Sequence, residues 1–594
     1  MKILSIYPWT HISSASLLID GKIVSAIAEE RLDRVKWSKK FPIKSIKWCL
    51  NSNNLSLEDI DYITVPWNPA HNIYATSNRW DNDIFWRGQF LSHIPSNLMK
   101  IIAKGPEDSM TTTFGKTKII YLNHHDCHAA STVIPSKFSK TDYLTIDGHG
   151  ETETCIMGHF NGKKFKKLHQ IMYPHSLGLF YGTITDFLGF KPDSDEWKTM
   201  ALASYSKSIK YDGKFNKLFK LTSKGFELDL SYFDFFLFDK KPSFFNKKLI
   251  EILGQPRNKE AKLEKRHFEI ASSLQRSFEK IAIHLLKITK RLSNKSSNVC
   301  LAGGAAMNCV FNGVLESNYK IYKNVFIPAW PDDLGVGLGS NLLLNSNLKK
   351  NKIIKSKKIS VYLGPQYSEK DIEKTLNKYN LKFYKPRNLY SVIANKITKQ
   401  KLIGWFQGRM EFSHRALGNR SILADPRNKK MQSIINQKVK FREGFRPFAP
   451  AVLKQHCQDW FDTNSDSPYM LMVSKVKKEK LVDFDEKNIV GLDKLKIIRS
   501  TVPAITHVNL TARIQTVDGK ENKMFYNLIN KFYELTECPI LVNTSFNVKD
   551  EPIVCSPEDA FRCFLYSDLD YLILGNYLLD KKKQYKNLEK DYLI

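Results

Sequence analysis

Residues 2–28, KILSIYPWTHISSASLLIDGKIVSAIA, carry the pattern that decides the fold. Apolar runs at 2–7, 16–19 and 22–28 predict three strands. The Asp20-Gly21 pair is a strong hairpin signal, because both central residues of a type I′ turn need positive φ. The same pattern returns at residues 143–169, YLTIDGHGETETCIMGHFNGKKFKKLH, with predicted strands at 143–147, 154–159 and 164–169. We therefore expect a duplicated, two-lobed α/β domain in which each copy opens with a β-meander followed by helices.

The second copy continues with a long amphipathic helix and a glycine turn. Apolar residues recur at helical spacing over 268–292, and a buried strand is predicted at 299–302. That strand ends in Gly303-Gly304 before a further helix, an arrangement that brings backbone N–H groups close to a ligand phosphate. A plain tight turn is the alternative. A second glycine series follows Asp333, and we expect it to form another wall of the cleft that would hold this phosphate ligand.

The composition changes near residue 348. Residues 345–358 contain no acidic residue and little apolar pattern, which is typical of a linker. Beyond them, predicted strands at 402–406 and 540–542 alternate with predicted helices at 428–438 and 557–567. We expect domains at 1–347 and 361–594, joined by a linker at 348–360, and an α/β fold throughout.

Composition excludes several classes of protein. With 42% hydrophobic residues among 594, the chain can form packed cores, and no apolar run is long enough to span a bilayer. The start lacks a signal peptide, and the nine cysteines form no CxxC pair, so we expect a cytoplasmic protein with neither a disulfide framework nor a zinc ribbon. Lys and Arg total 91 against 60 Asp and Glu, a net charge of +31. Such a charge attracts phosphate-rich partners, although a lysine-rich coding bias would produce the same count.

The sharpest local motif is Asn123-His124-His125-Asp126-Cys127-His128. Because His124 and His128 are four residues apart, they share one face of a helix and can both point at a metal ion. Histidines making local hydrogen bonds at a helix N-terminus are the alternative. Asp147 and Asp333, each beside glycines at the end of a predicted segment, favour the metal. Two imidazoles and two carboxylates suit iron(II), manganese or zinc.

The second predicted domain contains a cationic cluster. Arginines stand near glycines in the segment 408–420, and a second group lies in 440–450, where prolines and aromatic residues separate the charges. Further on, Arg513 and the segment 543–547 add a guanidinium group, hydroxyls and amides. Such groups converging from loops are typical of a site for a small phosphorylated substrate, whereas a salt-bridged surface is the alternative.

These motifs together resemble the NodU/TobZ family of O-carbamoyltransferases over nearly the whole chain. The resemblance is carried by residues 11–15, Ala28-Glu29-Glu30-Arg31, the His124 and His128 pair, Asp147-Gly148, residues 301–309, Gly408-Arg409-Met410-Glu411 and residues 445–450. It implies an ASKHA-like N-terminal domain and a YrdC-like C-terminal domain. It also implies two steps: carbamoyl-adenylate is made from carbamoyl phosphate and ATP, with Mg as the ATP counterion, and the carbamoyl group then passes to a hydroxyl. Trp197 departs from the glycine expected in many relatives.

The resemblance also assigns roles to residues of this chain. The metal ligands would be His124, His128, Asp147 and Asp333, with iron(II) as the expected ion. The nucleotide would contact Gly148, Lys198, Gly303, Gly304 and Asn308, with Glu196 nearby. Carbamoyl phosphate would be held by Arg415, Lys440, Arg446, Arg513 and Ser545, of which Lys440 and Arg446 are also expected to be catalytic.

The acceptor hydroxyl must lose its proton as it attacks, and His11 is our general-base candidate because an imidazole titrates near working pH. A capping or packing histidine is the alternative. A net charge of +31 exceeds what a small sugar requires, so we expect the hydroxymethyl group of 5-hydroxymethylcytosine in DNA or RNA as the acceptor.

Basic and aromatic residues alternate at 37–41 and at 79–87, and these could stack an extruded base or simply pack in the protein. A sugar or small natural product is the alternative acceptor. Two remote alternatives are a carbamoyl donor for protein maturation, like HypF, and a non-enzymatic nucleic-acid-binding protein. We expect a monomer or homodimer.

Overall fold

The structure is a computed structural model of the 594-residue chain. It describes residues 1–9, 12–69, 93–98, 101, 117–237, 243–293, 295–349, 358–441, 444–486 and 489–584. His11, the segment 79–87 and most of the predicted linker, residues 350–357, lie outside the described residues. Among the described residues, no helix is both long and apolar enough to cross a bilayer.

Two five-stranded sheets with the same strand order form the N-terminal part. The first has the order β3-β2-β1-β4-β5 and the second β12-β11-β6-β7-β8, so each contains an antiparallel meander extended by two parallel strands. This repeat confirms the expected duplication of two α/β lobes. The strands are β1 (Lys2–Tyr7), β2 (Ser14–Ile19), β3 (Lys22–Ala28), β4 (Tyr62–Val65), β5 (Lys118–Tyr121), β6 (Thr141–Ile146), β7 (Glu153–Phe160), β8 (Phe165–Met172), β11 (Asn298–Ala302) and β12 (Asn324–Phe326).

The hairpin at Asp20-Gly21 forms as its sequence requires. Asp20 has φ 49° and Gly21 has φ 80°, so both residues adopt the left-handed conformation that the turn between β2 and β3 needs. Each inner strand is buried almost throughout, since both faces of these sheets are covered.

Helices α4 (His124–Val133) and α11 (Val336–Leu348) pack against each other, α11 on the first sheet and α4 on the second. Their crossing is close, because a Cβ at Gly339 would lie 2.0 Å from the Cys127 carbonyl oxygen. Further helices and a small hairpin complete the N-terminal part: α1 (Glu30–Asp33), α2 (Ile43–Asn51), α5 (Leu177–Phe187), α6 (Glu196–Ala203), α7 (Asp212–Phe215), α8 (Lys247–Leu253), α9 (Lys265–Leu292), α10 (Cys309–Val314), β9 (Phe219–Thr222) and β10 (Gly225–Leu228).

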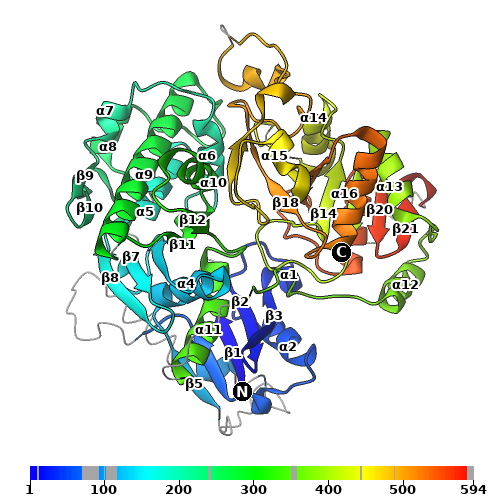
Figure 1. Cartoon of the computed structure of the whole chain (residues 1–594), viewed down its shortest axis with the longest axis horizontal. Coiled ribbons are helices and arrows are strands. Elements are labelled where there is room, and N and C mark those ends of the chain that lie inside the picture. The colour runs from blue at the N-terminus through cyan, green and yellow to red at the C-terminus, as the bar shows by residue number, and fades with distance from the viewer. Residues whose placement is uncertain are drawn as a thin grey trace.

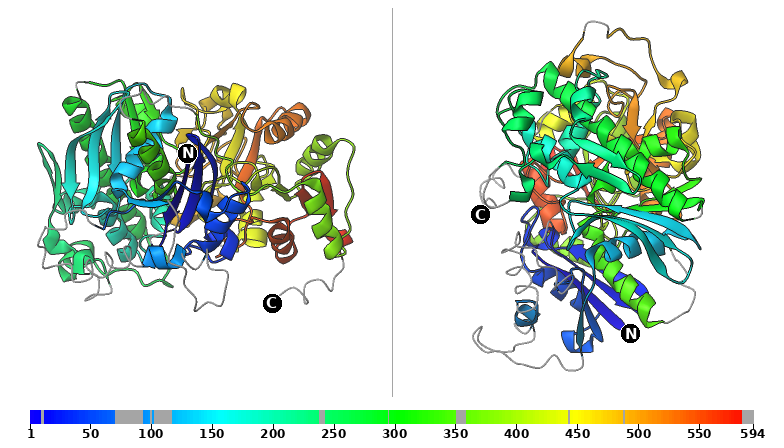
Figure 2. Two further views of the ribbon diagram at one scale, coloured as in Figure 1. Left: turned by 90° about the horizontal axis from the view of Figure 1, so that it is seen from below. Right: turned by 90° about the vertical axis from the view of Figure 1, so that its left-hand side faces the viewer.

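The C-terminal part is built on a seven-stranded mixed sheet with the order β18-β15-β19-β14-β13-β20-β21. It lies beside both N-terminal sheets (Figures 1 and 2). Its elements are α12 (Glu369–Lys378), α13 (Leu389–Thr398), β13 (Ile403–Phe406), β14 (Arg420–Ala424), α14 (Met431–Ile435), β15 (Ala449–Leu453), α15 (Cys457–Trp460), β16 (Val473–Lys475), β17 (Thr511–Arg513), β18 (Gln515–Val517), α16 (Lys523–Thr536), β19 (Ile540–Ser545), α17 (Pro557–Tyr566), β20 (Tyr571–Leu574) and β21 (Tyr577–Asp580).

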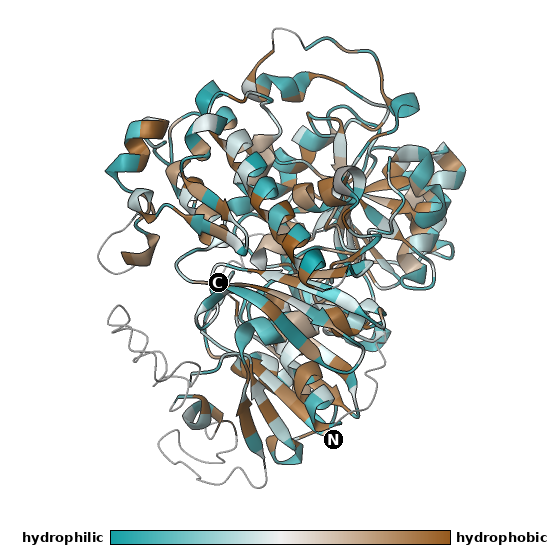
Figure 3. Ribbon diagram, turned by 60° about the vertical axis from the view of Figure 1, so that its left-hand side comes forward, coloured by the Kyte–Doolittle hydropathy of each residue, from teal (hydrophilic) through white to brown (hydrophobic). Residues whose placement is uncertain are grey.

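The whole molecule is therefore mixed α/β, as expected. Hydrophobic residues concentrate on the strands and on the helix faces turned toward them (Figure 3). All nine cysteines are free and buried, which agrees with the expected absence of a disulfide framework.

Candidate active site

Four side chains from three places in the N-terminal part converge where the two sheets meet. His124 and His128 come from the first turns of α4, Asp147 follows β6, and Asp333 precedes α11. One ligand atom from each lies within 4.8 Å of the others. The His128 Nε2 atom lies 2.8 Å from Asp147 Oδ2 and 3.4 Å from Asp333 Oδ1. The structure thus brings together all four residues that the sequence marked as metal ligands.

Neighbouring groups orient three of the four ligands toward this cluster, whereas His128 Nδ1 is buried without a hydrogen-bond partner among the described residues. The Tyr7 hydroxyl donates to Asp333 Oδ2 at 2.7 Å, and the Gly148 N–H donates to Asp147 Oδ1 at 2.7 Å, so the other carboxylate oxygens face the histidines. The His124 Nδ1 atom lies 3.3 Å from the Pro66 carbonyl oxygen, which leaves Nε2 for the cluster. These contacts are the supporting hydrogen bonds that metal sites require. The donor set therefore fits a transition-metal ion.

The electrostatics of the cluster favour a cation. Burial opposes a charge on His124, yet Asp333 and Asp147 raise its pKa well above the usual value of 6.5. Burial likewise opposes the charge of Asp333, but the two histidines hold its pKa well below 3.8. Two carboxylates in a buried site thus remain ionised and attract positive charge.

His125, the middle histidine of the motif, has a packing role. Its Nδ1 atom bonds to the Thr145 hydroxyl at 2.7 Å, and its Nε2 atom lies 3.0 Å from the Glu153 carbonyl oxygen. Burial, together with the charges of His124 and His128, lowers the pKa of His125 to about 3. His125 is therefore neutral and holds α4 on the second sheet.

The predicted glycine turn lies directly beside the cluster. Gly303 has φ +89°, and a Cβ there would lie 2.1 Å from the Ile146 carbonyl oxygen, so only glycine fits. A Cβ at Gly304 would lie 3.1 Å from Asp147 Oδ1. The close approach places the turn after β11 against the end of β6, which carries Asp147.

Two other predicted nucleotide contacts have partners within the protein. The Asn308 side chain accepts from the Phe311 N–H at 3.0 Å, which caps α10, and it forms two hydrogen bonds with the Gln275 amide. The Lys198 ammonium lies 2.9 Å from Asp195 Oδ2. Their contact with a nucleotide stays a prediction.

The predicted cationic residues form three groups of contacts. Lys440 donates to Asn547 Oδ1 at 2.7 Å and to the Ser545 hydroxyl at 3.2 Å. Arg415 lies near Arg513, and burial together with that like charge lowers its pKa. Arg446 lies on the ring of Trp197, with its guanidinium carbon 3.8 Å from the ring centroid.

Not all arginines of the 408–420 motif belong to an anion site. Arg420 is fully buried and donates to the carbonyl oxygens of Gln407 at 2.6 Å and Pro365 at 3.1 Å. Arg409 donates to the Leu363 and Val24 carbonyl oxygens. Both therefore stabilise the chain's own loops. The Nε atoms of Arg415 and Arg420 are each buried without a hydrogen-bond partner among the described residues, and of these two arginines Arg415 is the one that lies near Arg513. A buried N–H in that state is a candidate for a ligand contact.

Sequence reasoning missed two charged residues at these sites. The Glu151 carboxylate accepts from the backbone N–H groups of His124 at 2.9 Å and Asn68 at 2.7 Å, so it fixes the start of α4 beside the cluster. Lys36 is an exposed lysine that lies near the charges of Asp550, Glu30, Arg446 and Asp195. An acid close after the Gly148-His149-Gly150 loop could have marked Glu151, but no local pattern marks Lys36.

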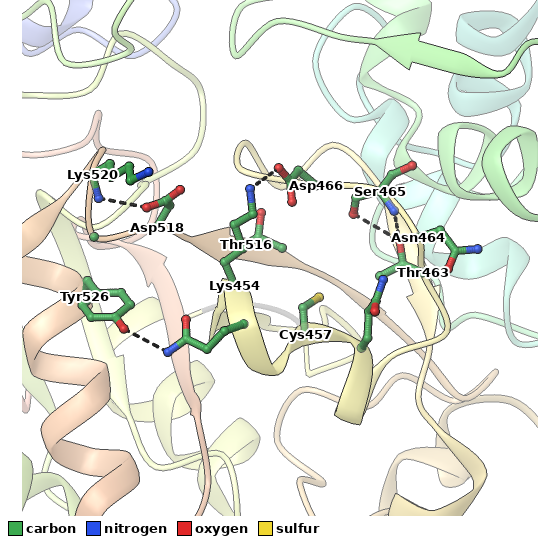
Figure 4. A pocket seen from close by; sticks show the side chains of 13 residues that line it. Lys454, Cys457, Thr463, Asn464, Ser465, Asp466, Thr516, Asp518, Lys520 and Tyr526 are labelled. Atoms are coloured by element: carbon green, nitrogen blue, oxygen red, sulfur yellow. Dashed lines mark hydrogen bonds and ion pairs between the residues drawn. The ribbon is translucent and has the colours of Figure 1, made fainter.

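A separate cavity of about 680 Å³ lies beyond the carboxyl ends of β15 and β18 (Figure 4). Among its lining residues, Lys454 pairs with Asp466, and Gln455 donates to the Tyr526 hydroxyl at 2.9 Å. None of the residues predicted for catalysis or binding lines it.

Comparison with known proteins identifies the family. Residues 2–342 match the model of the carbamoyltransferase N-terminus, and residues 394–581 match that of the carbamoyltransferase C-terminus. An uncharacterized protein of Synechocystis, sll1178, is 38% identical over 98% of this chain and 97% of its own length. Nodulation protein NolNO of Sinorhizobium fredii is 33% identical over 96% of this chain and 79% of its own length. Since the N-terminal match alone covers more than half of the residues, the chain belongs to the carbamoyltransferase family and is an enzyme of carbamoyl transfer.

Proposed function

We propose that the chain is an ATP-dependent O-carbamoyltransferase that works in two steps. The C-terminal part makes carbamoyl-adenylate from carbamoyl phosphate and ATP, and the N-terminal part transfers the carbamoyl group to a hydroxyl. Release of both phosphate and pyrophosphate balances when one water is consumed. Water cleaves carbamoyl phosphate to carbamate and phosphate, and a carbamate oxygen then bonds to the α-phosphorus of ATP as pyrophosphate leaves.

The cationic residues of the C-terminal part serve the first step. Arg415 and Arg513 are like charges close together, and binding an anion between them would relieve their repulsion. Lys440 is held by Ser545 and Asn547 at a fixed position, from which its ammonium can reach a phosphate oxygen. With Arg446, these groups would neutralise carbamoyl phosphate and the phosphates of Mg-ATP.

The convergence of His124, His128, Asp147 and Asp333 is the observation that carries the second step. Iron(II), or else manganese or zinc, would act there as a Lewis acid that neutralises the adenylate phosphate, a good leaving group. A Cβ at Gly148 would meet no atom within 4 Å, so there is open space beside this site. We propose that the nucleotide contacts Gly148 and the backbone of Gly303 and Gly304, with Asn308 and Lys198 as further contacts. His11 remains our candidate for the base that takes the hydroxyl proton.

Two classes of acceptor are proposed, each on its own observation. The net charge of +31 favours the hydroxymethyl group of 5-hydroxymethylcytosine in DNA or RNA. The burial of Phe41 in segment 37–41 weighs against base stacking there and so toward the alternative acceptor, a sugar or small natural product. Phe41 is 8% exposed and packs on Trp9 with ring centroids 5.5 Å apart, so it cannot stack on a base. A remote third alternative is that the carbamoyl group is donated to a partner protein during its maturation.

The division into two steps can be tested with three variants of the full chain. His124→Ala should abolish transfer yet keep the carbamoyl-phosphate-dependent release of pyrophosphate, whereas Lys440→Ala should stop both. Asn161→Ala, at an exposed turn, is the control and should keep both. Loss of pyrophosphate release in a folded His124→Ala protein would contradict the two-site division.

The acceptor can be identified by mass spectrometry. The protein is incubated with carbamoyl phosphate and Mg-ATP together with hydroxymethylcytosine DNA, with the free nucleoside, or with a panel of sugars. Carbamoylation of DNA supports the polynucleotide acceptor. Modification of sugars or free nucleosides with no reaction on DNA excludes it.

A further inference from the structure

Trp197 joins the two parts of the molecule at Arg446. The tryptophan lies in the first turn of α6, within the region that matches the carbamoyltransferase N-terminus, and Arg446 lies within the C-terminal match. The Arg446 guanidinium carbon is 3.8 Å from the Trp197 ring centroid. A second contact joins the same segments, because the Tyr205 hydroxyl donates to the Phe445 carbonyl oxygen at 3.2 Å.

The Trp197 ring is itself held in place. Its Nε1–H donates to the Ser194 carbonyl oxygen at 3.1 Å, and the Lys198 ammonium, paired with Asp195, lies 5.5 Å from the ring centroid. The Trp197 side chain is only partly buried. A guanidinium lying on an aromatic face keeps its in-plane N–H groups for hydrogen bonds to an anion.

We propose that Trp197 is a positioning residue for the first step: its ring holds the Arg446 guanidinium across the domain boundary so that the N–H groups of Arg446 face carbamoyl phosphate. The inference rests on the proposed function, in which Arg446 binds that substrate. It assigns to the N-terminal part a share in the anion site of the C-terminal part. Any aromatic ring at position 197 should serve, whereas a side chain without a flat face should not.

The test measures carbamoyl-phosphate-dependent pyrophosphate release by the full chain. Trp197→Ala should raise the KM for carbamoyl phosphate about 3- to 30-fold, the range expected for loss of one cation–π contact, and leave kcat within about twofold. Trp197→Phe and Trp197→Tyr should restore most of the affinity. Phe190→Ala is the matched control, because Phe190 also lies near Lys198, at 5.6 Å, but contacts Arg257 in place of Arg446.

A double-mutant cycle separates this inference from the proposed function. If Trp197 acts through Arg446, the double variant Trp197→Ala/Arg446→Ala has the KM of Arg446→Ala alone. An unchanged KM in Arg446→Ala would refute the role of Arg446 in the proposed function. A raised KM in Arg446→Ala, with an independent, multiplying effect of Trp197→Ala, would overturn only the positioning role. If Trp197→Ala does not fold, Trp197→Leu replaces it and is compared with Trp197→Phe.

Discussion

Glu196 should make the stability of this protein fall as the pH rises from about 4.5 to about 7. Glu196 is the first residue of α6, and its carboxylate accepts a hydrogen bond from the Asp193 N–H at 2.7 Å. Burial, with the nearby charges of Asp193 and Asp195, raises the pKa of Glu196 from 4.5 to about 7. The folded protein therefore holds a proton that the unfolded chain has already released at pH 6.

The sign and size of the effect follow from linkage. Below pH 4.5 both states are protonated and the group contributes nothing. Between pH 4.5 and 7 the unfolded state loses its proton first, so the free energy of unfolding falls, and above pH 7 the loss is complete. The interval between these two pKa values, at about 1.36 kcal/mol per pH unit, corresponds to about 3 kcal/mol.

Glu196→Gln tests this reasoning, because the amide stays neutral and its oxygen can still accept from Asp193. Urea unfolding followed by tryptophan fluorescence gives the difference in unfolding free energy between variant and wild type. That difference should shift in favour of the variant by about 2 to 3 kcal/mol from pH 5 to pH 8. Glu251→Gln, at an exposed position on α8, is the control and should show no such shift. Parallel pH curves for Glu196→Gln and wild type would refute the argument.

Four further predictions concern the two sites. His128→Ala should reduce bound transition metal, measured by plasma mass spectrometry, from about one ion per chain to near none. His125→Ala should retain the metal but lose about 1 to 3 kcal/mol of stability, since its two buried hydrogen bonds disappear. Gly303→Ala should lower the thermal midpoint, because its Cβ would overlap the Ile146 carbonyl oxygen; an unchanged midpoint would refute the close approach. Arg415→Ala should raise the midpoint without ligand and abolish any increase caused by phosphate, because the repulsion from Arg513 is removed with the anion site; a phosphate effect that persists would exclude this pair.

The fold could be predicted from the sequence where short-range signals dominate. The Asp20-Gly21 turn sets the pairing of β2 with β3 as far as Leu18, beyond which a bulge shifts the register, and the alternation of residues around the turn gives the first meander. Segment 206–253 could not be predicted, because its two 3-10 turns, the β9-β10 hairpin and two short helices are held by contacts between residues distant in sequence. Such long-range contacts produce no periodic pattern of apolar residues in the sequence.

The convergence of the two histidines and two aspartates was predictable, and the positions of the arginines only partly so. A helix fixes the geometry of His124 and His128 from their spacing alone, and strand ends beside glycines indicated Asp147 and Asp333. Arginine has no comparable geometric rule. Arg409, Arg415 and Arg420 stand in one short motif. Arg409 and Arg420 donate to backbone carbonyl oxygens, whereas Arg415 lies beside Arg513. The path of the loop decides these partners, and the sequence of the motif does not reveal that path. Asn308 similarly caps a helix, a role its neighbours in sequence do not reveal.

Several lysines outside these sites pack on aromatic rings, and this packing bears on the choice between a polynucleotide and a small acceptor. Lys248 lies 4.3 Å from the ring centroid of Tyr232, Lys214 lies 5.1 Å from that of Tyr211, and Lys280 lies 5.5 Å from that of Phe219. Lysines in such contacts cover aromatic rings with their stems and stabilise the N-terminal part without any anionic partner. Part of the excess charge is thus explained by packing. Phe41, in a segment for which base stacking and packing were both considered, is also buried in the protein. Charge alone therefore cannot decide for a polynucleotide, and the direct comparison of DNA with sugars as acceptors carries that decision.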